Sequence, residues 1–222
     1  MENTDALLFC FINHTHLRSK GLDWFMFSLT QFGQGWLVLI LLTGVYFGNN
    51  FEGSWYAESF VTVLAAGVIC QIIKKYLPRS RPVSVLPHVN VLGKRLASGS
   101  FPSGHTATAF SLAIVFSSHW EIMTPVLLFT ASLIGVTRIY VGAHFPLDVC
   151  CGAIIGLTTS SLVLTFLHIA PAYNIQYPFT LVFGTILLLA LSLPFLGGYT
   201  FAKMAQRLRE KIVRVQVVLQ GR

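Results

Sequence analysis

Long apolar runs that carry almost no charge constrain this chain more than any other feature of its sequence. A helix needs about 20 apolar residues to cross the roughly 30 Å hydrocarbon core of a bilayer. Only 10% of the 222 residues are charged, against roughly 25% in an average soluble domain. The chain is therefore expected to be an integral membrane protein. Runs suited to about six spans occupy residues 24–51, 55–73, 96–120, 122–137 and 149–202, the last divided at 168–178.

The same runs predict an all-α fold, a polytopic bundle of transmembrane helices. Strands of a membrane barrel would alternate apolar and polar residues over about ten positions, whereas these runs are longer and continuously apolar. The connections between the runs are short, and no internal repeat is visible. These features indicate a single membrane-embedded domain over residues 1–222.

The two ends of the chain differ from the rest. Residues 7–12 are apolar but too short to span a bilayer, and basic residues follow them, which favours a helix lying in the membrane interface. Glu2 and Asp5 stand where a signal peptide would be basic, so a cleaved leader is not expected. Residues 203–222 repeat apolar and basic positions at helical spacing, which predicts an amphipathic helix on anionic lipid headgroups.

Unusual polar residues gather where four of the predicted spans begin or end. Successive spans cross in opposite directions, so the ends of the second and fourth and the starts of the third and fifth share one membrane face. Charges at membrane depth are costly unless they are paired or functional, and their convergence therefore predicts a site. The polar residues that lie at these span ends are Lys74, Lys75, Arg79, Arg81, Ser103, His105, Arg138, His144 and Asp148.

Residues 100–105, Ser-Phe-Pro-Ser-Gly-His, lead into the third span. Proline suits the first position of a helix, which makes Pro102 the expected start, with the cap one or two residues earlier. The amides of Ser103, Gly104 and His105 then lack intrahelical acceptors at the positive end of the helix, where an anion fits. A plain helix cap beside an interfacial histidine is the alternative for so short a motif.

A second motif surrounds the start of the fifth span. With Pro146 as the first helical residue, His144 lies just outside the helix and Asp148 in its first turn, so their side chains can meet. Asp148 could accept the proton on one nitrogen of His144 and leave the other nitrogen free to attack. This use requires a phosphate held opposite. Otherwise the pair merely caps a helix at the interface.

Basic residues nearby supply the charge that would hold such a phosphate. Lys74 has a compact ammonium group. Arg81 and Arg138 have planar guanidinium groups, which suit the equatorial oxygens of a phosphoryl group during its transfer. Pro78 and Pro82 should bend the chain, so that Lys74 and Arg81 need not follow helical spacing. Four further cations are expected to contact lipid headgroups. These are Lys75, Arg79, Lys94 and Arg95.

Together these residues spell a known pattern. Its three blocks are Lys74 followed after six residues by Arg81-Pro82, the Pro-Ser-Gly-His of 102–105, and Arg138 followed by His144 and Asp148 with five and three residues between. Over this motif core, residues 74–148, the chain resembles the type 2 phosphatidic acid phosphatase superfamily, the integral membrane lipid phosphatases. Thr137 stands where that family usually has serine, a change that keeps the hydroxyl.

The resemblance implies a lipid phosphate as substrate and a role for each motif residue. His144 would form a phosphohistidine, Asp148 would orient it, and His105 would protonate the leaving group. The residues implied to bind phosphate are Lys74, Arg81, Ser103, Gly104 and Arg138. The family needs no metal, and no cofactor is expected, since the sequence shows no convincing cluster of carboxylate or Cys/His ligands.

Other functions stay open on the sequence alone. A phosphotransferase would use the same phosphohistidine with a lipid acceptor in place of water. A transporter or non-catalytic scaffold is a different class, but transport usually needs polar or broken helices at the midplane. Haloperoxidases that bind vanadate share the motif and are soluble. The substrate could be phosphatidate, phosphatidylglycerophosphate, a polyprenyl diphosphate or a lipid A phosphate. Membrane lipids are expected partners, and neither nucleic acid nor an obligate protein partner is.

Two patterns disagree about which way the site faces. Both termini and all 15 Lys and Arg residues are expected on the membrane face that carries the site. Glu52, Glu58 and Glu121 are expected on the opposite face. The positive-inside rule then points the site toward the cytoplasm. The resemblance instead implies the periplasmic or equivalent outer face of a bacterial inner membrane. Because phosphate binding itself demands several of the basic residues, the outward-facing site is preferred.

Overall fold

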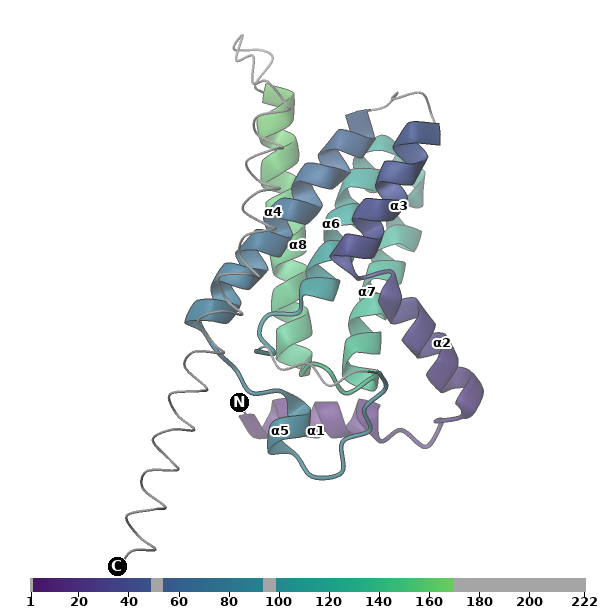
Figure 1. Ribbon diagram of the computed structural model, residues 1–222, viewed down its shortest axis with the longest axis vertical. Helices are drawn as coiled ribbons and strands as arrows, with labels where there is room; N and C mark the ends of the chain where they lie inside the picture. The colour runs from purple at the N-terminus through teal and green to yellow at the C-terminus, as the bar shows by residue number, and fades with distance from the viewer. Residues whose placement is uncertain (1, 49–53, 94–98, 170–222) are drawn as a thin grey trace, which may run out of the picture.

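A computed structural model describes residues 2–48, 54–93 and 99–169, and this part of the chain is helical, without strands (Figure 1). Its elements are α1 (Glu2–Asn13), α2 (Lys20–Gln31), α3 (Gly35–Gly48), α4 (Ser54–Tyr76), α5 (Pro82–Val85), α6 (Gly104–His119), the 3-10 turn η1 (Glu121–Met123), α7 (Thr124–Tyr140) and α8 (Pro146–Ile169). The all-α prediction is confirmed for these residues. The predicted sixth span and the predicted helix at 203–222 lie outside them.

Helix α6 lies at the centre of the bundle, packed against α4, α7 and α8 (Figure 1). Its contact with α8 depends on small residues. A Cβ atom at Gly152 would clash with the carbonyl oxygen of Ser103, and one at Gly156 would lie 2.5 Å from that of Ala107. Small residues four apart on one face let membrane helices approach closely. This approach holds the first turn of α6 beside the first turn of α8.

Three of the described helical stretches are long and apolar enough to cross a membrane: Trp55–Tyr76, Glu121–Tyr140 and Pro146–Ile169. The predicted first span, 24–51, is not one straight helix, because α2 and α3 are bent by 67° and count as a fourth span only as a pair. Helix α6 has 16 residues, which gives it a length of about 24 Å. The count of six spans therefore stays a prediction.

The break between α2 and α3 falls at residues 32–34. This corner of the chain lies against α6. A Cβ atom at Gly33 would lie 2.9 Å from the Cβ of His105 and 3.0 Å from the side chain of Ile134. Only glycine leaves room for this approach. The bend was not predicted, because an apolar run shows a lack of charge and not the direction of the chain, and the single span itself stays a prediction.

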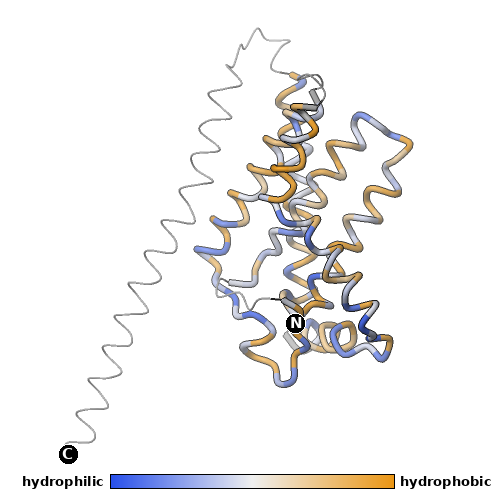
Figure 2. The backbone as a smooth tube through the Cα atoms, turned by 45° about the vertical axis from the view of Figure 1, so that its right-hand side comes forward, coloured by the Kyte–Doolittle hydropathy of each residue, from blue (hydrophilic) through white to orange (hydrophobic). Residues whose placement is uncertain are grey.

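The two ends of the bundle differ in character. At the end where α4 and α7 finish and α6 and α8 begin, here called the site end, hydrophilic stretches alternate with hydrophobic ones along the connecting segments (Figure 2). At the opposite end, called the far end, the rings of Trp55, Phe116 and Trp120 pack with centroids 5.9–6.1 Å apart. Tryptophan is enriched where membrane meets water, so these rings fit an interface at the far end.

Helix α1 lies across the site end (Figure 1). Asn13 is fully buried and donates hydrogen bonds to the carbonyl oxygens of Asn90 at 3.0 Å and Tyr140 at 2.9 Å. Phe9 is also fully buried, whereas Phe11 is 81% exposed. The predicted short N-terminal helix is therefore present and anchored to the bundle. Its position in a membrane interface stays a prediction.

Candidate active site

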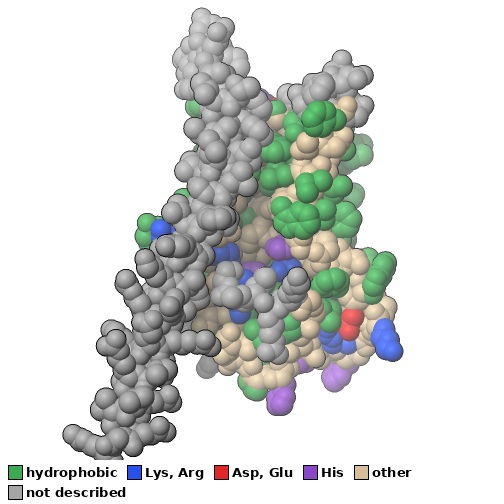
Figure 3. All heavy atoms as spheres, viewed as in Figure 1, with side chains coloured by type: hydrophobic (Ala, Val, Ile, Leu, Met, Phe, Trp, Pro, Cys, Tyr) green, Lys and Arg blue, Asp and Glu red, His purple; other side chains and the backbone are tan. Residues whose placement is uncertain are grey.

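The predicted site residues come together at the site end. Lys74 lies near the end of α4, Arg81 just before α5, Ser103, Gly104 and His105 at the start of α6, Arg138 near the end of α7, and His144 and Asp148 around the start of α8. On the face drawn in Figure 3, basic and histidine side chains gather in a hollow, while hydrophobic side chains cover the part above it. The convergence inferred from alternating spans is therefore present in the fold.

A cavity of about 480 Å³ opens among these residues. Arg81, His105 and Arg138 line it, together with Gln34 from the corner between α2 and α3 and with residues 91–93. Its volume falls within the roughly 300–1,000 Å³ typical of small-molecule sites. Two arginines and a histidine facing one cavity form an arrangement suited to a phosphate group.

Arg138 lines this cavity and has a hydrogen-bond donor to spare. Its side chain is buried, and Nη1 donates to the hydroxyl of Thr30 at 2.6 Å. Its Nε is buried with no hydrogen-bond partner in the described part of the chain. Such unpaired buried groups are rare and call for a functional explanation. A phosphate oxygen would provide the missing acceptor.

Arg81 and Lys74 are both engaged with the backbone. Arg81 donates to the carbonyl oxygens of Ala143 at 2.7 Å and Gly99 at 3.2 Å. The ammonium of Lys74 donates to the carbonyl oxygens of residues 99, 100 and 102, at 3.1, 3.4 and 2.6 Å. Lys74 thus ties the end of α4 to the loop that precedes His105. Its predicted contact with phosphate remains a proposal.

The start of α6 differs by two residues from its prediction. Ser103, not the residues before Pro102, is the N-cap, and the helix begins at Gly104. The hydroxyl of Ser103 accepts from the Thr106 amide at 3.4 Å and the Thr106 hydroxyl at 2.8 Å. Serine is a strong cap, and this outweighs the preference of proline for the first turn. The Ser103 amide donates to the carbonyl oxygen of Asp148 at 2.9 Å, so it already has an acceptor.

His144 and Asp148 meet as the sequence predicted, and α8 does begin at Pro146. The side chains of His144 and Asp148 are 3% and 0% exposed, and His144 Nδ1 lies 3.6 Å from Asp148 Oδ2. This separation exceeds a hydrogen bond and leaves Nδ1 without one among the described residues. The same Oδ2 accepts from the Phe145 amide at 2.9 Å.

The environment of His144 sets its charge. Burial lowers the pKa of His144 to about 3, against the raising influence of Asp148, and the charges of Arg138 and Arg81 lower it further. The imidazole is therefore neutral at physiological pH, since burial among cations disfavours its protonated form. A neutral imidazole retains the lone pair that a nucleophile needs.

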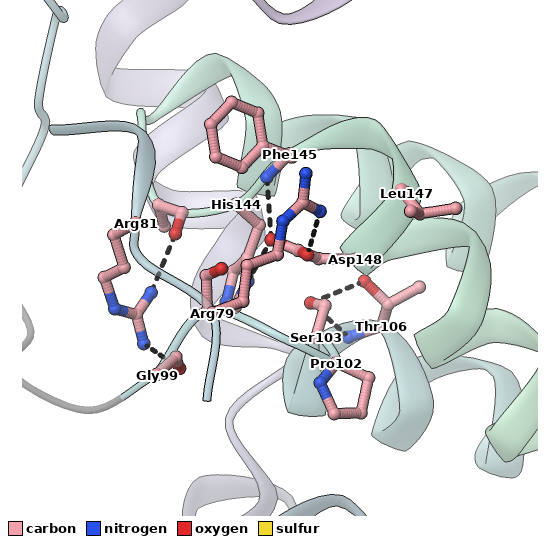
Figure 4. A network of polar contacts seen from close by, with 12 residues as sticks. Arg79, Arg81, Gly99, Pro102, Ser103, Thr106, His144, Phe145, Leu147 and Asp148 are labelled. Atoms are coloured by element: carbon pink, nitrogen blue, oxygen red, sulfur yellow. Dashed lines mark hydrogen bonds and ion pairs between the residues drawn. The ribbon is translucent and has the colours of Figure 1, made fainter. Parts of the chain in front are cut away.

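Arg79 corrects the sequence analysis, which assigned it to lipid headgroups. Its guanidinium donates to Asp148 Oδ1 at 2.6 Å (Figure 4). It also donates to Asp5 Oδ2 at 2.5 Å. A fully buried carboxylate such as Asp148 is costly without a charged partner. This requirement predicts a basic partner for Asp148, but it does not distinguish Arg79 from the other cations near the site. Lys75 is exposed, and Lys94 and Arg95 lie outside the described residues.

Metal ligands do not gather among the described residues, where no group of three His, Cys, Asp or Glu side chains could hold an ion. The carboxylate nearest to His144 is bonded instead to Arg79. Cations and imidazoles thus dominate the donors that meet at the site. The predicted lack of a metal requirement is taken up below as part of the proposed function.

Comparison with known proteins defines the family. The model of the PAP2 superfamily matches residues 55–172, just over half of the chain and all of its motif core. The chain belongs to this superfamily. Together with the apolar helices described above, this membership identifies it as a multi-pass integral membrane protein of a phosphatase family.

Individual relatives extend the likeness beyond the motif. The bacitracin transport permease protein BcrC of Bacillus licheniformis is 27% identical over 172 residues, covering 75% of this chain and 84% of that protein. The undecaprenyl-diphosphatase BcrC of Bacillus subtilis is 33% identical over 147 residues, covering 65% of this chain and 75% of that protein. The solved structure of Aquifex aeolicus LpxE superposes with a TM-score of 0.63 at 35% identity, covering 71% of this chain and 93% of that one.

Proposed function

We propose that this protein hydrolyses the phosphate monoester or diphosphate of a membrane lipid through a phosphohistidine at His144. The carrying observation is the cavity at the site end, which is lined by Arg81, Arg138 and His105. The buried, neutral His144 follows the lining residue Ala143 in the chain and lies close enough to both arginines for their charges to lower its pKa. The two arginines would neutralise charge on the phosphoryl oxygens. The amides of Gly104 and His105, in the first turn of α6, would add donors at its positive end.

The reaction divides into two displacements at phosphorus. Binding of the anionic phosphate beside His105 favours protonation of that imidazole. In the first displacement, the free nitrogen of His144 forms a bond to phosphorus while the bond from phosphorus to the leaving oxygen breaks, and the protonated His105 gives that oxygen its proton. In the second, His105 takes a proton from water, the hydroxide oxygen bonds to phosphorus, and the bond to His144 breaks. Asp148 stabilises the positive charge on His144 in between. No metal takes part.

An apolar groove provides room for the lipid chain. It has a volume of about 270 Å³ and lies along α3, α6 and α7, with Phe32, Val38, Leu42, Ala113 and Ile134 among its lining residues. Gly33, at the corner between α2 and α3, contacts both Ile134 and His105. The groove therefore starts close to the cavity, which supports a substrate with a phosphate head and an apolar tail.

The test is phosphate release by purified protein from four lipids: a polyprenyl diphosphate, phosphatidate, phosphatidylglycerophosphate and a lipid A phosphate. The name of the Bacillus subtilis relative puts the diphosphate first in this panel. We expect turnover of at least one lipid, unchanged by excess EDTA. Loss of activity on chelation with recovery on adding a divalent ion would refute the metal-free mechanism.

Hydrolysis and phosphotransfer share the first displacement and differ in the second. Reaction in water enriched in oxygen-18 should place one labelled oxygen in each phosphate released, since water attacks the phosphohistidine. Transfer of phosphate to an added lipid alcohol, with no release, would assign a phosphotransferase instead.

The name of the Bacillus licheniformis relative raises transport as another class. The charge distribution favours an enzyme. In α4, α7 and α8 the ionisable side chains lie near the helix ends, as Glu58, Arg138 and Asp148 illustrate. Transport pathways usually place such groups or broken helices at the membrane midplane.

For its location we propose a bacterial inner membrane with the site on the outer face, against the positive-inside rule. Single cysteines at Ser84 and Ser118 would decide, because both serines are exposed and belong to the site end and the far end. In a variant without native cysteines, a membrane-impermeant thiol reagent added to intact cells should label Ser84→Cys and spare Ser118→Cys. The reverse pattern would place the site in the cytoplasm.

A further inference from the structure

Arg79 bridges two carboxylates that are far apart in the sequence. One belongs to Asp148, which is completely buried, and the other to Asp5 of α1, which is 10% exposed. The side chain of Arg79 is 27% exposed, and its guanidinium carbon lies over the ring of Phe145, 4.5 Å from the centroid. Two charged bonds and a stacked ring hold this arginine in one orientation.

The two oxygens of Asp148 have separate partners. Oδ2 faces His144 and accepts the Phe145 amide, whereas Oδ1 accepts from Arg79. A carboxylate held at only one oxygen is free to rotate about its side-chain bonds, but one held at both is not. Arg79 therefore sets which oxygen of Asp148 faces His144 (Figure 4).

Helix α1 supports this arrangement through Asp5. Oδ2 of Asp5 accepts from Arg79, and Oδ1 accepts from the amide of Leu147 in the first turn of α8 at 2.9 Å. On the same helix, the ring of Phe9 packs against that of Phe145 with centroids 5.5 Å apart. The N-terminal helix thus contacts both the arginine and the start of the helix that carries Asp148.

Arg79 differs in placement from the arginines that would bind phosphate. Arg81 and Arg138 line the cavity, and Arg79 does not. Its Nη1 and Nη2 are each bonded to a carboxylate. A guanidinium so engaged is unsuited to gripping a second anion, whether phosphate or lipid headgroup.

We propose that Arg79, held in place by Asp5 of α1, is a positioning residue that fixes the Asp148 carboxylate against His144. The inference rests on the proposed phosphohistidine function and deepens it. Its consequence is kinetic. Loss of Arg79 misorients the pair that forms and stabilises the phosphohistidine, while the groups that bind phosphate stay in place. The turnover number should therefore fall without a matching loss of substrate binding.

The variants Arg79→Gln and Asp5→Asn test this proposal. Arg79→Gln removes the charge, and Asp5→Asn keeps an acceptor for the Leu147 amide while replacing the partner of Arg79. We expect Arg79→Gln to lower kcat about 10- to 100-fold, with KM and the inhibition constant of inorganic phosphate within about twofold of the unmodified protein. Asp5→Asn should show a smaller loss of kcat with the same split. In the double variant, Asp5→Asn should cause little further loss of kcat, because the arginine that Asp5 holds in place is already absent.

Two further variants complete the design. Lys75→Gln removes a neighbouring exposed cation and should leave kcat unchanged. Arg79→Lys should restore part of the lost turnover, because an ammonium can reach one carboxylate but lacks the fork that bridges two. Thermal unfolding in detergent checks that each variant is folded. If Arg79→Gln is poorly folded, the kinetics of Asp5→Asn decide the proposal.

Three results would overturn the proposal: full activity of Arg79→Gln, a tenfold weaker inhibition by phosphate, or fully additive losses in the double variant. The second result would make Arg79 a phosphate ligand. Failure of the proposed function looks different, because then the unmodified protein would release no phosphate from any lipid and His144→Ala would change nothing.

Discussion

At the far end of the bundle, the buried carboxylate of Glu58 accepts a hydrogen bond from His119 at 2.7 Å and lies 3.6 Å from His168. At the site end, the buried imidazole of His144 lies beyond hydrogen-bond distance of Asp148. Both ends thus place a histidine beside a buried carboxylate. At the far end the histidine and the carboxylate are hydrogen-bonded to each other, and at the site end they are not.

Unpaired atoms sharpen this contrast. Among the described residues, the buried side-chain atoms without a hydrogen bond are Arg138 Nε and His144 Nδ1 at the site end and the hydroxyl of Ser59 at the far end. A neutral hydroxyl costs less to bury than part of a cation. The difference teaches that buried polar side chains indicate a functional site when some of their nitrogen atoms lack hydrogen-bond partners, because a ligand can then supply the missing acceptor.

The largest expected effect comes from exchanging one histidine at each end for alanine. His144→Ala should reduce turnover by about 10⁴-fold or more, because it removes the nucleophile. His119→Ala should leave turnover within about twofold, because His119 contacts Glu58 and lies far from the cavity. Protein labelled with radioactive phosphate and quenched in alkaline detergent, which preserves a phosphorus–nitrogen bond, should keep the label in His119→Ala and lose it in His144→Ala. Comparable losses in both variants would erase the distinction between the two ends.

A smaller effect, and one that depends on the substrate, is expected for His105. As the general acid, it should matter most when the leaving oxygen is a poor leaving group. His105→Ala should slow hydrolysis of an alkyl phosphate about 10²- to 10⁴-fold. It should slow hydrolysis of nitrophenyl phosphate much less, since that leaving group needs no proton. Parallel steady-state assays of the two esters measure the difference, and equal losses would remove His105 from this role.

The smallest effect on activity, with a clear effect on stability, is expected at the far end. His119→Ala leaves the buried Glu58 without its hydrogen-bonded partner and should lower the free energy of unfolding by about 1–3 kcal/mol. Adding Glu58→Gln should recover part of this loss, because a neutral amide is cheaper to bury than an unpaired carboxylate. Denaturant unfolding in detergent checks both. If the double variant is less stable than His119→Ala, the pair is not a closed structural unit.

Several features of the site followed from local sequence. Pro146 starts α8, so the spacing to Asp148 already placed that carboxylate in the first turn, near His144. The gathering of Lys74, Arg138 and the start of α6 at one end followed from the alternating direction of successive helices. These inferences held because helix starts and crossing directions depend on residues close together in the chain.

Other features required the packed fold. The serine at the cap of α6 competes with the proline just before it, and the outcome depends on contacts of Ser103 with Asp148. The bend at Gly33 depends on the space left by His105. In both cases the deciding neighbour lies tens of residues away, beyond the reach of a local pattern.

The sequence by itself determined the class of the protein and the identity of its motif residues, because charge-free runs and the spacing of three motif blocks are properties of the chain alone. Only the tertiary structure decided that Arg79 joins Asp5 to Asp148. Asp5 lies 74 positions from Arg79 in the chain, and Asp148 lies 69 positions from it. The physical reason lies in the burial of Asp148. A carboxylate that is buried away from solvent needs a cation close to it in space. The residues next to Arg79 in the sequence do not indicate which carboxylate it contacts.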